Sequence, residues 1–389
     1  MQKIVLDGIW ELGICSNDTF RKNKINIVDL DSLCNSNITV IEGHVPGNYE
    51  IDLEKAGIIE NPFYGKNLLK SLDREMDHLF YGKKFVLDKV INEKYILQFD
   101  GIDTIADIYL NGSLLAHTEN MLRGYEFEVG EELLNKGDNE LLVHIIPVSL
   151  EARKYDNPLF QNGLKYEMDS LNIRKSPYMY GWDIFPRMLS GGIWKSVRIF
   201  NKPDFRFIQS YLFVRNLNTD YSSAQLEFFY EVDLNEAPYH GFEIVLEGHC
   251  KESSFSMNWD VWSKAGHFTF DVENPLLWWP RRSGEPELYD VKVQLKKDGV
   301  CYAQKDFRFG IRTVELQKTS LTDENGKGEF CFWVNHKKTF ILGTNWVPLD
   351  SLPSRGKERI EPSLKLVEDL DCNICLLYTS DAADDLTRV

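Results

Sequence analysis

The sequence predicts a mainly β protein made of two β-sandwich pieces followed by a shorter α/β piece. Runs of strand length recur through the first 316 residues, and Gly, Pro, Asn or Asp separates most of them. After about residue 316 the pattern changes to a short apolar run, a loop and a helix-like segment. Many short strands without helices between them are typical of sandwiches or barrels, whereas strand, loop and helix in succession indicate an α/β arrangement.

The strongest strand signal lies between residues 95 and 112. Residues 95 to 99 and 106 to 110 alternate in hydrophobicity, and Asn111-Gly112 follows as a hairpin turn. Further runs of strand length are residues 122 to 129, 140 to 146, 193 to 200, 207 to 214, 224 to 232, 242 to 247, 266 to 271 and 288 to 296. We expect each of them to form a strand.

Few helices are predicted. Residues 51 to 56 suit a helix of one or two turns that stops at Gly57. In the third piece, residues 340 to 342 predict a short strand and residues 363 to 370 a helix. Turn residues at 201 to 204 and at 312 to 327 mark the expected linkers.

Charge restricts the class of partner. The formal net charge is -16 and the pI is about 5.0, so phosphate backbones and anionic lipid surfaces would be repelled. We therefore expect neither a nucleic acid nor a membrane as partner, and a neutral substrate fits better. No secretion signal or run of apolar residues long enough to span a membrane is visible.

The cysteines and histidines predict neither a disulfide scaffold nor a metal site. Seven Cys are widely spread, which favours reduced thiols and a cytoplasmic location. Cys372 and Cys375 form a single C-x-x-C without a second pair or a suitably spaced His. No Gly-rich phosphate-binding loop is present, so we expect no metal and no cofactor.

Several motifs follow one another in a specific order. In the first part of the chain they are Leu6-Asp7-Gly8-Ile9-Trp10, Val45-Pro46-Gly47, Asn61-Pro62-Phe63-Tyr64-Gly65, Phe99-Asp100-Gly101-Ile102-Asp103-Thr104-Ile105-Ala106 and Tyr109-Leu110-Asn111-Gly112. Later ones are Arg174-Lys175-Ser176-Pro177-Tyr178, Gly181-Trp182-Asp183-Ile184-Phe185-Pro186-Arg187, Gly192-Ile193-Trp194, Leu277-Trp278-Trp279-Pro280, Phe309-Gly310-Ile311-Arg312-Thr313 and Leu342-Gly343-Thr344-Asn345-Trp346-Val347-Pro348-Leu349-Asp350-Ser351. Together they resemble the β-mannosidase branch of glycoside hydrolase family 2, over residues 1 to about 374.

The resemblance implies four segments. Residues 1–202 would form a jelly-roll, galactose-binding-like domain, and residues 203–316 an immunoglobulin-like β-sandwich. Residues 317–374 would begin a (β/α)8 TIM barrel, which carries the catalytic site in this family. Residues 375–389 resemble a translated sequencing adapter, so we expect a non-biological tail and a longer natural protein. Ile184 replaces the aromatic residue usual after the Trp-Asp pair, and Phe80-Tyr81-Gly82-Lys83 replaces a more usual Tyr-Arg pattern.

The family's two catalytic carboxylates would be missing. A retaining glycosidase needs an acid/base and a nucleophile about 5 to 5.5 Å apart. In the family both are Glu residues on later barrel strands, beyond the end of this chain. We therefore expect the complete protein to be a retaining enzyme that removes terminal non-reducing β-D-mannose from β-mannosides and mannooligosaccharides. The chain of 389 residues alone is expected to be inactive.

Five residues are candidates for binding the carbohydrate. By the resemblance, Asp183 accepts hydrogen bonds from mannose hydroxyls, although a loop Asp that caps a turn would look the same. Trp182 either stacks on a sugar or packs between domains. The remaining candidates lie where the first expected barrel strand ends: Asn345, Trp346 and Asp350. They either line the substrate pocket or have buried structural roles. Two alternatives stay open: activity on another β-glycoside (a glucosaminide, galactoside or glucuronide), and a non-catalytic carbohydrate-binding sandwich protein.

Overall fold

The computed structural model describes residues 3–90, 93–156, 168–182, 184–234, 239–318, 328 and 330–377. Its chain divides into two compact units. The first contains Met1–Lys202, Trp346–Ser363 and Leu377–Val389, and the second contains Pro203–Asn345 and Leu364–Leu376. Strands dominate the described part of both, which confirms the mainly β prediction.

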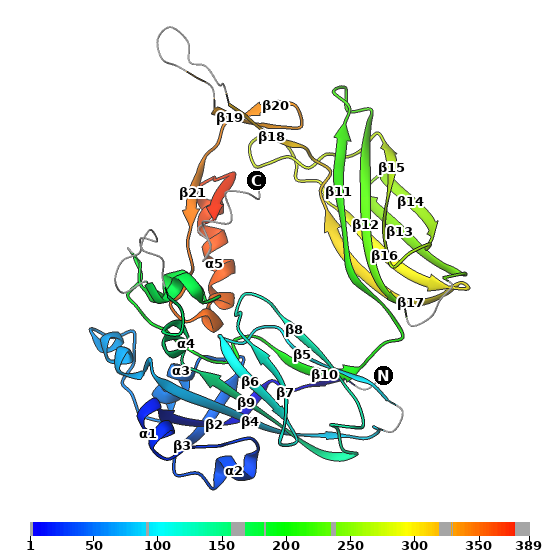
Figure 1. The fold of residues 1–389 in the computed structure, drawn as a ribbon. Helices are drawn as coiled ribbons and strands as arrows, with labels where there is room; N and C mark the ends of the chain where they lie inside the picture. Colours follow the sequence, from blue (N-terminus) through cyan, green and yellow to red (C-terminus); the bar gives the residue numbers. More distant parts are fainter. Residues whose placement is uncertain are drawn as a thin grey trace. The chain divides into compact units, whose positions relative to one another are not determined.

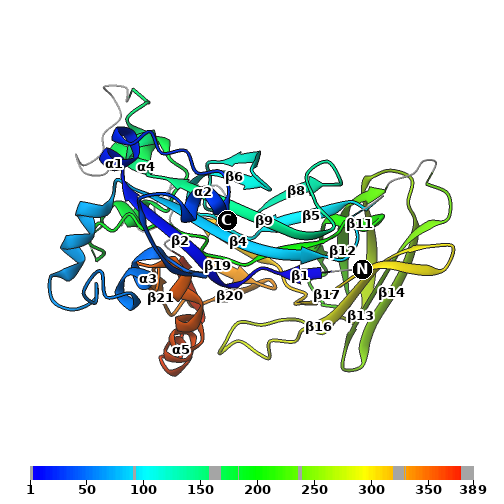
Figure 2. The same cartoon turned by 90° about the horizontal axis from the view of Figure 1, so that it is seen from below.

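Two antiparallel sheets form the first unit (Figures 1 and 2). The larger has the order β3-β2-β4-β9-β6-β7. Its strands are β2 (Gly8–Ser16), β3 (Thr39–Val45), β4 (Asp77–Leu87), β6 (Ile105–Leu110), β7 (Ser113–Thr118) and β9 (Gly137–Ile146). The smaller has the order β1-β10-β5-β8. Its strands are β1 (Lys3–Val5), β5 (Tyr95–Phe99), β8 (Tyr125–Val129) and β10 (Val197–Asn201).

The inner faces of these two sheets share one hydrophobic core. Trp10 and Tyr81 from the larger sheet and Leu97 and Ile199 from the smaller sheet belong to the same buried cluster. The indole Nε1 of Trp10 donates to the carbonyl oxygen of Leu6 at 2.7 Å, so its burial leaves no unpaired donor. The first unit is therefore the predicted β-sandwich.

Short helices connect the strands of the first unit. They are α1 (Asn17–Lys22), α2 (Leu30–Cys34), α3 (Tyr49–Lys55), α4 (Val148–Ala152) and the 3-10 helices η1 (Asn67–Arg74), η2 (Met168–Asn172), η3 (Pro177–Tyr180) and η4 (Pro353–Arg355). The helix α3 confirms the prediction for residues 51 to 56. No sequence pattern predicted α1 and α2, which are only 6 and 5 residues long.

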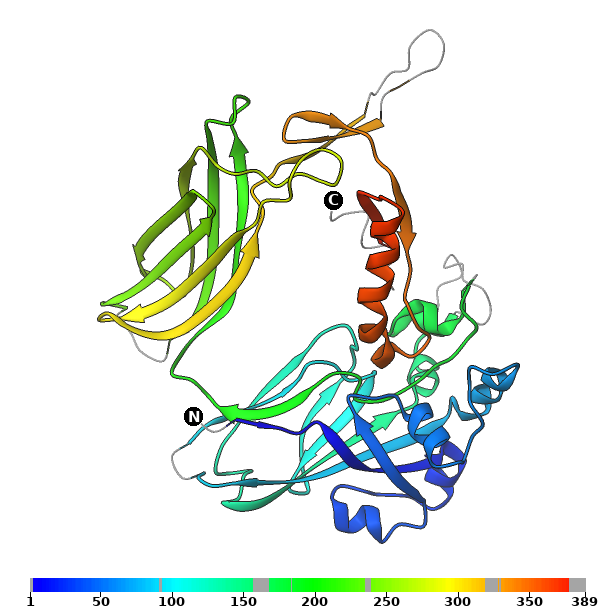
Figure 3. The same cartoon turned by 180° about the vertical axis from the view of Figure 1, so that it is seen from behind.

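The second unit contains a second sandwich, whose two sheets are seen from behind in Figure 3. One sheet has the order β11-β12-β15 and the other β14-β13-β16-β17. The strands are β11 (Phe205–Leu217), β12 (Ser223–Leu234), β13 (Phe242–Cys250), β14 (Ser253–Asp260), β15 (Ala265–Glu273), β16 (Tyr289–Lys297) and β17 (Val300–Phe309). Phe228, Ile244, Phe270 and Tyr289 meet in its core.

Smaller elements follow this sandwich. They are the sheet β18-β19-β20 with β18 (Val314–Lys318), β19 (Phe330–Val334) and β20 (Lys337–Thr339), the pair β21 (Gly343–Trp346) and β22 (Ile374–Leu377), and the helix α5 (Gly356–Asp369). The helix predicted at 363 to 370 is thus the second half of α5. Residues 375 to 377 of the expected tail belong to β22, and residues 378 to 389 lie outside the described residues.

The predicted strand at residues 340 to 342 is wrong. These residues lie between β20 and β21, and the side chain of one residue forms hydrogen bonds with their backbone groups. Asn373 donates from Nδ2 to the carbonyl oxygen of Phe340 at 2.8 Å, and its Oδ1 accepts from the amide of Leu342 at 2.9 Å. An amide side chain has therefore replaced the strand partner that the apolar run predicted.

Candidate functional site

The turn that carries Trp182 is fixed by backbone hydrogen bonds. The amide of Trp182 donates to the carbonyl oxygen of Phe185 at 2.8 Å, and the amide of Phe185 donates back to Trp182 at 3.1 Å. Gly181 precedes the turn with a φ of 113°, a conformation that suits glycine. Asp183 lies outside the described residues, so its predicted role stays a prediction.

Trp182 presents a partly open side chain. The residue is 37% exposed, and its neighbour Ile184 is 60% exposed. The ring of Phe185 packs instead against Tyr178, with 5.2 Å between the ring centroids. A tryptophan exposed to this extent can present part of its apolar indole to the C-H groups of a sugar.

An ion pair connects this segment to a distant part of the first unit. Arg187 binds Glu75 through two bonds, Nε to Oε1 at 2.7 Å and an Nη2 contact to Oε2 at 2.9 Å. The same Nη2 lies 3.5 Å from Oδ2 of Asp169, and the guanidinium lies 5.5 Å from the ring centroid of Tyr180. Arg187 ends the motif Gly181-Trp182-Asp183-Ile184-Phe185-Pro186-Arg187, and no role was predicted for it from the sequence.

A buried polar network closes the base of the segment. Lys175 Nζ donates to Asp103 Oδ1 at 2.5 Å and to the carbonyl oxygen of Ser190 at 2.7 Å. The hydroxyl of Ser190 in turn donates to Glu50 Oε2 at 2.6 Å and accepts from Asn48 Nδ2 at 2.8 Å. Burial raises the pKa of Glu50 to about 8, so this carboxyl group is protonated at neutral pH.

Asp350 is buried and its carboxylate is already engaged. Its Oδ1 accepts from the amide of Leu352 at 3.0 Å. Its Oδ2 lies 3.3 Å from Nε of Arg355 and 3.0 Å from Nε of Arg359. The guanidinium of Arg355 also lies 4.3 Å from the ring centroid of Phe63. Asp350 therefore holds the segment that follows it in place through Leu352, Arg355 and Arg359.

The other two candidates lie in and at the end of β21. Asn345 is exposed and Trp346 is half-buried. Asp350 contributes to the electrostatic field at the Tyr178 hydroxyl, because the pKa of Tyr178 is raised first by burial and then by the charges of Asp103 and Asp350. The ring of Tyr178 itself packs on Phe185 of the Trp182 turn.

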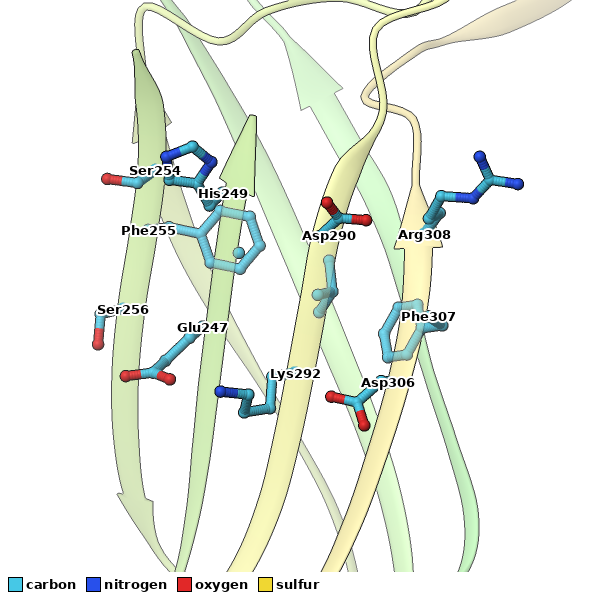
Figure 4. Close-up of a pocket in the computed structure, with 12 residues that line it drawn as sticks. Glu247, His249, Ser254, Phe255, Ser256, Asp290, Lys292, Asp306, Phe307 and Arg308 are labelled. Atoms are coloured by element: carbon cyan, nitrogen blue, oxygen red, sulfur yellow. The ribbon is translucent and has the colours of Figure 1, made fainter. Parts of the chain in front are cut away.

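A separate hollow of about 810 Å³ lies over the sheet β14-β13-β16-β17 (Figure 4). Glu247, Lys292 and Asp306 stand opposite one another across three of its strands. Opposite charges in neighbouring cross-strand positions are typical of a solvated sheet face. Of the two aromatic rings that line it, Phe255 is only 7% exposed and Phe307 is half-buried.

Neither metal nor membrane signals emerge from the described residues. No group of three or more His, Cys, Asp or Glu side chains there is arranged to hold a metal ion. Likewise, among those residues no helix is long and apolar enough to cross a bilayer.

Comparison with known families identifies the two sandwiches. The model described as "Glycosyl hydrolase 2 galactose-binding domain-like" matches residues 21–195, and "Glycosyl hydrolases family 2" matches residues 207–312. The chain belongs to glycoside hydrolase family 2. Both sandwiches of this family 2 chain are therefore those that the motif order predicted, the first galactose-binding-like and the second of the family's immunoglobulin-like type.

Within family 2 the chain is similar to β-mannosidases. Beta-mannosidase B of Aspergillus clavatus is 31% identical over 331 residues, which are 83% of this chain and 38% of the relative. The Aspergillus oryzae protein of the same name is 30% identical over 336 residues, with the same coverage. The chain thus spans well under half the length of these relatives.

Solved structures agree with the fold. A β-D-mannosidase from Dictyoglomus thermophilum superimposes with a TM-score of 0.79 at 30% identity, covering 94% of this chain and 42% of that one. An exo-chitosanase from Amycolatopsis orientalis superimposes with a TM-score of 0.64 at 17% identity, covering 97% and 41%. The second likeness shows the fold alone.

Proposed function

We propose that the complete protein containing this sequence is a retaining exo-β-mannosidase. It would remove terminal, non-reducing β-D-mannose from β-mannosides and mannooligosaccharides through a glycosyl-enzyme intermediate. The 30% identity to the solved β-D-mannosidase across 94% of this chain supports this proposal. The single structural observation that supports it most is the partly open Trp182 on a turn closed by two backbone hydrogen bonds.

Two neighbouring side chains would recognise the sugar. Asp183 would accept hydrogen bonds from mannose hydroxyls, and Trp182 would stack on the apolar face of the ring. Ile184, 60% exposed beside them, would replace the second aromatic of the family pattern and offer a smaller apolar contact.

Asn345, Trp346 and Asp350 would line the same subsite. Of these, Asp350 would act mainly through its neighbours, because both of its oxygens already have partners. Its charge would hold Arg355 and Arg359, and a guanidinium can donate to a sugar hydroxyl.

The chemical step would belong to residues that this chain does not contain. Residues 1–202 and 203–316 would be the two sandwich domains, residues 317–374 the start of a catalytic TIM barrel, and residues 375–389 a non-biological tail. The 389-residue chain alone would then show no hydrolysis. We place the protein in the cytoplasm, which its seven free cysteines support.

Two other functions remain as alternatives. The family also includes relatives named for other β-glycosides, so a glucosaminide, galactoside or glucuronide is the alternative substrate. A non-catalytic carbohydrate-binding protein is the alternative from another class; its binding surface would be the same turn.

One experiment separates these possibilities. The complete protein should be assayed with the 4-nitrophenyl β-glycosides of mannose, glucosamine, galactose and glucuronic acid. We expect the highest kcat/KM with the mannoside. A higher kcat/KM with another glycoside would show that this other sugar is the substrate. Absence of turnover with all four, together with calorimetric binding of mannobiose, would favour the non-catalytic alternative.

A further inference from the structure

The segment from Lys175 to Ser190 is held closed at its base. Lys175 Nζ reaches across to the carbonyl oxygen of Ser190, and the side chains of Lys175 and its ion-pair partner Asp103 have 0% exposure. Midway, the amide of Met188 donates to the carbonyl oxygen of Met179 at 2.8 Å. Both ends of the segment are therefore anchored in the first sandwich.

The outer part of the segment has a different anchor. Arg187 follows Phe185 by two residues. Its side chain binds Glu75, which directly follows η1. The side chains of Arg187 and Glu75 are only 19% and 14% exposed. A two-bonded, partly buried guanidinium-carboxylate pair fixes both distance and orientation, which a single bond of an exposed pair does not.

We propose that Arg187 and Glu75 are a positioning pair that holds the Trp182 turn in its substrate-binding place. This inference rests on the proposed function, because it assumes that the turn contacts the sugar. Neither residue touches the substrate; they act through the turn. Without the pair, the two internal hydrogen bonds of the turn would open more often, and the turn would have to be ordered again at each binding event, which weakens binding.

The chain offers a matched control in the same sandwich. Arg198, in β10, contacts both oxygens of Asp100 through Nη2, at 2.5 and 2.7 Å, and Asp100 directly follows β5. Its side chain is 27% exposed and that of Asp100 is 30% exposed, so this pair is also partly buried. Arg198→Lys therefore makes the same chemical change in a guanidinium-carboxylate pair that does not hold the turn.

The test compares Arg187→Lys, Glu75→Gln and the control Arg198→Lys in the complete protein. With 4-nitrophenyl β-D-mannoside we expect the first two variants to raise KM about tenfold with kcat nearly unchanged, as loss of uniform binding requires. The control should leave KM within about twofold. Amide hydrogen exchange at Trp182 and Phe185 should become faster in the first two variants and stay unchanged in the control.

The outcomes separate this inference from the proposed function. Unchanged exchange at Trp182 and Phe185 in the Arg187 and Glu75 variants would overturn the positioning role, whatever happens to activity. Faster exchange with an unchanged KM would also overturn it, because the turn would then not matter for the sugar. Faster exchange in a protein that hydrolyses no mannoside would instead defeat the proposed function and leave the anchoring of the turn standing.

Discussion

Lys175 and Asp103 form an ion pair with 2.5 Å between Nζ and Oδ1, and neither side chain is exposed. The two residues are separated by 72 positions in the sequence. Their pairing ties the segment that bears Trp182 to the loop before β6. In an interior without water, each charge is stabilised by the opposite charge of its partner. Removal of either side chain would therefore leave the other as a buried, unpaired charge.

Removing one partner of this pair should destabilise the first sandwich strongly. We expect Lys175→Met to lower the free energy of unfolding by about 3 to 5 kcal/mol, because Asp103 would be left as a buried, unpaired charge. The measurement is urea unfolding followed by circular dichroism. Lys94→Met, which removes the exposed pair with Glu128, should leave the midpoint unchanged. Equal midpoints for both variants would contradict the structural role of the Lys175 pair.

A pH-dependent stability should trace to Glu50. Burial raises its pKa from 4.5 to about 8, so the folded protein keeps a proton that the unfolded chain releases above pH 4.5. Because the folded state then binds more protons, the free energy of unfolding should fall by roughly 1 kcal/mol per pH unit up to about pH 8. Glu50→Gln should remove this slope, as measured by urea unfolding in buffers of increasing pH.

Two buried histidines also make stability depend on pH. Burial lowers the pKa of His78 from 6.5 to about 4 and that of His144 to about 3. In acid the unfolded chain therefore binds protons that the folded state does not bind. The free energy of unfolding falls as the pH decreases below 6.5. Because these histidines titrate in both proteins, their contribution cancels when the slope of Glu50→Gln is subtracted from that of the unsubstituted protein. Equal slopes in the two proteins would disprove the assignment to Glu50.

Local patterns predicted strands in which a polar residue interrupts the apolar run or a turn signal follows it, such as Gln98 within Tyr95–Phe99. Residues 95 to 99 became β5, and Asn111-Gly112 became the turn between β6 and β7, as expected. Strand β4 was not predicted because its residues 78 to 82 are all buried. Leu30 and Leu33 of α2 cover its outer face at Gly82, so apolar and polar residues no longer alternate there.

The candidate site was predictable only in part, because its supports are distant in the sequence. Trp182 stood out through its motif. Its anchor Glu75 is 112 residues away from Arg187, and no local pattern joins the two. The partner Arg355 is close to Asp350 in the sequence, but the burial of Asp350 depends on how the chain folds after β21. Pairings of this kind come from tertiary structure, which a periodicity does not contain.

Asp350 should prove to be an organising residue. Asp350→Asn in the complete protein keeps an acceptor for the Leu352 amide but removes the charge that holds Arg355 and Arg359. We expect unfolding to become easier by about 1 to 3 kcal/mol and kcat/KM for a mannoside to decrease along with it. The control is Glu358→Gln, at an exposed position of α5. Lost activity at an unchanged unfolding midpoint would indicate that Asp350 binds substrate directly.

Asp183 should behave in the opposite way to Asp350. In the complete protein, Asp183→Ala and Asp183→Asn should reduce kcat/KM for mannosides far more than they reduce stability. A charged acceptor to a sugar hydroxyl contributes roughly 1.5 to 3 kcal/mol, which corresponds to about one to two decades in kcat/KM when the bond is made in the transition state. The measurements are kcat/KM with 4-nitrophenyl β-D-mannoside and the urea midpoint of each variant.

The control for Asp183 has to be an Asp that faces solvent. Asp107 is unsuitable, because its Oδ1 lies 2.7 Å from Nδ1 of His117. Asp138, exposed at the start of β9, is the better choice, and Asp138→Ala should change neither measurement. If Asp183→Ala matches Asp138→Ala in kcat/KM, Asp183 only caps the turn. Substrate recognition would then have to depend on Trp182 and on the residues that follow β21, since the hydroxyl acceptor expected beside the indole would be absent.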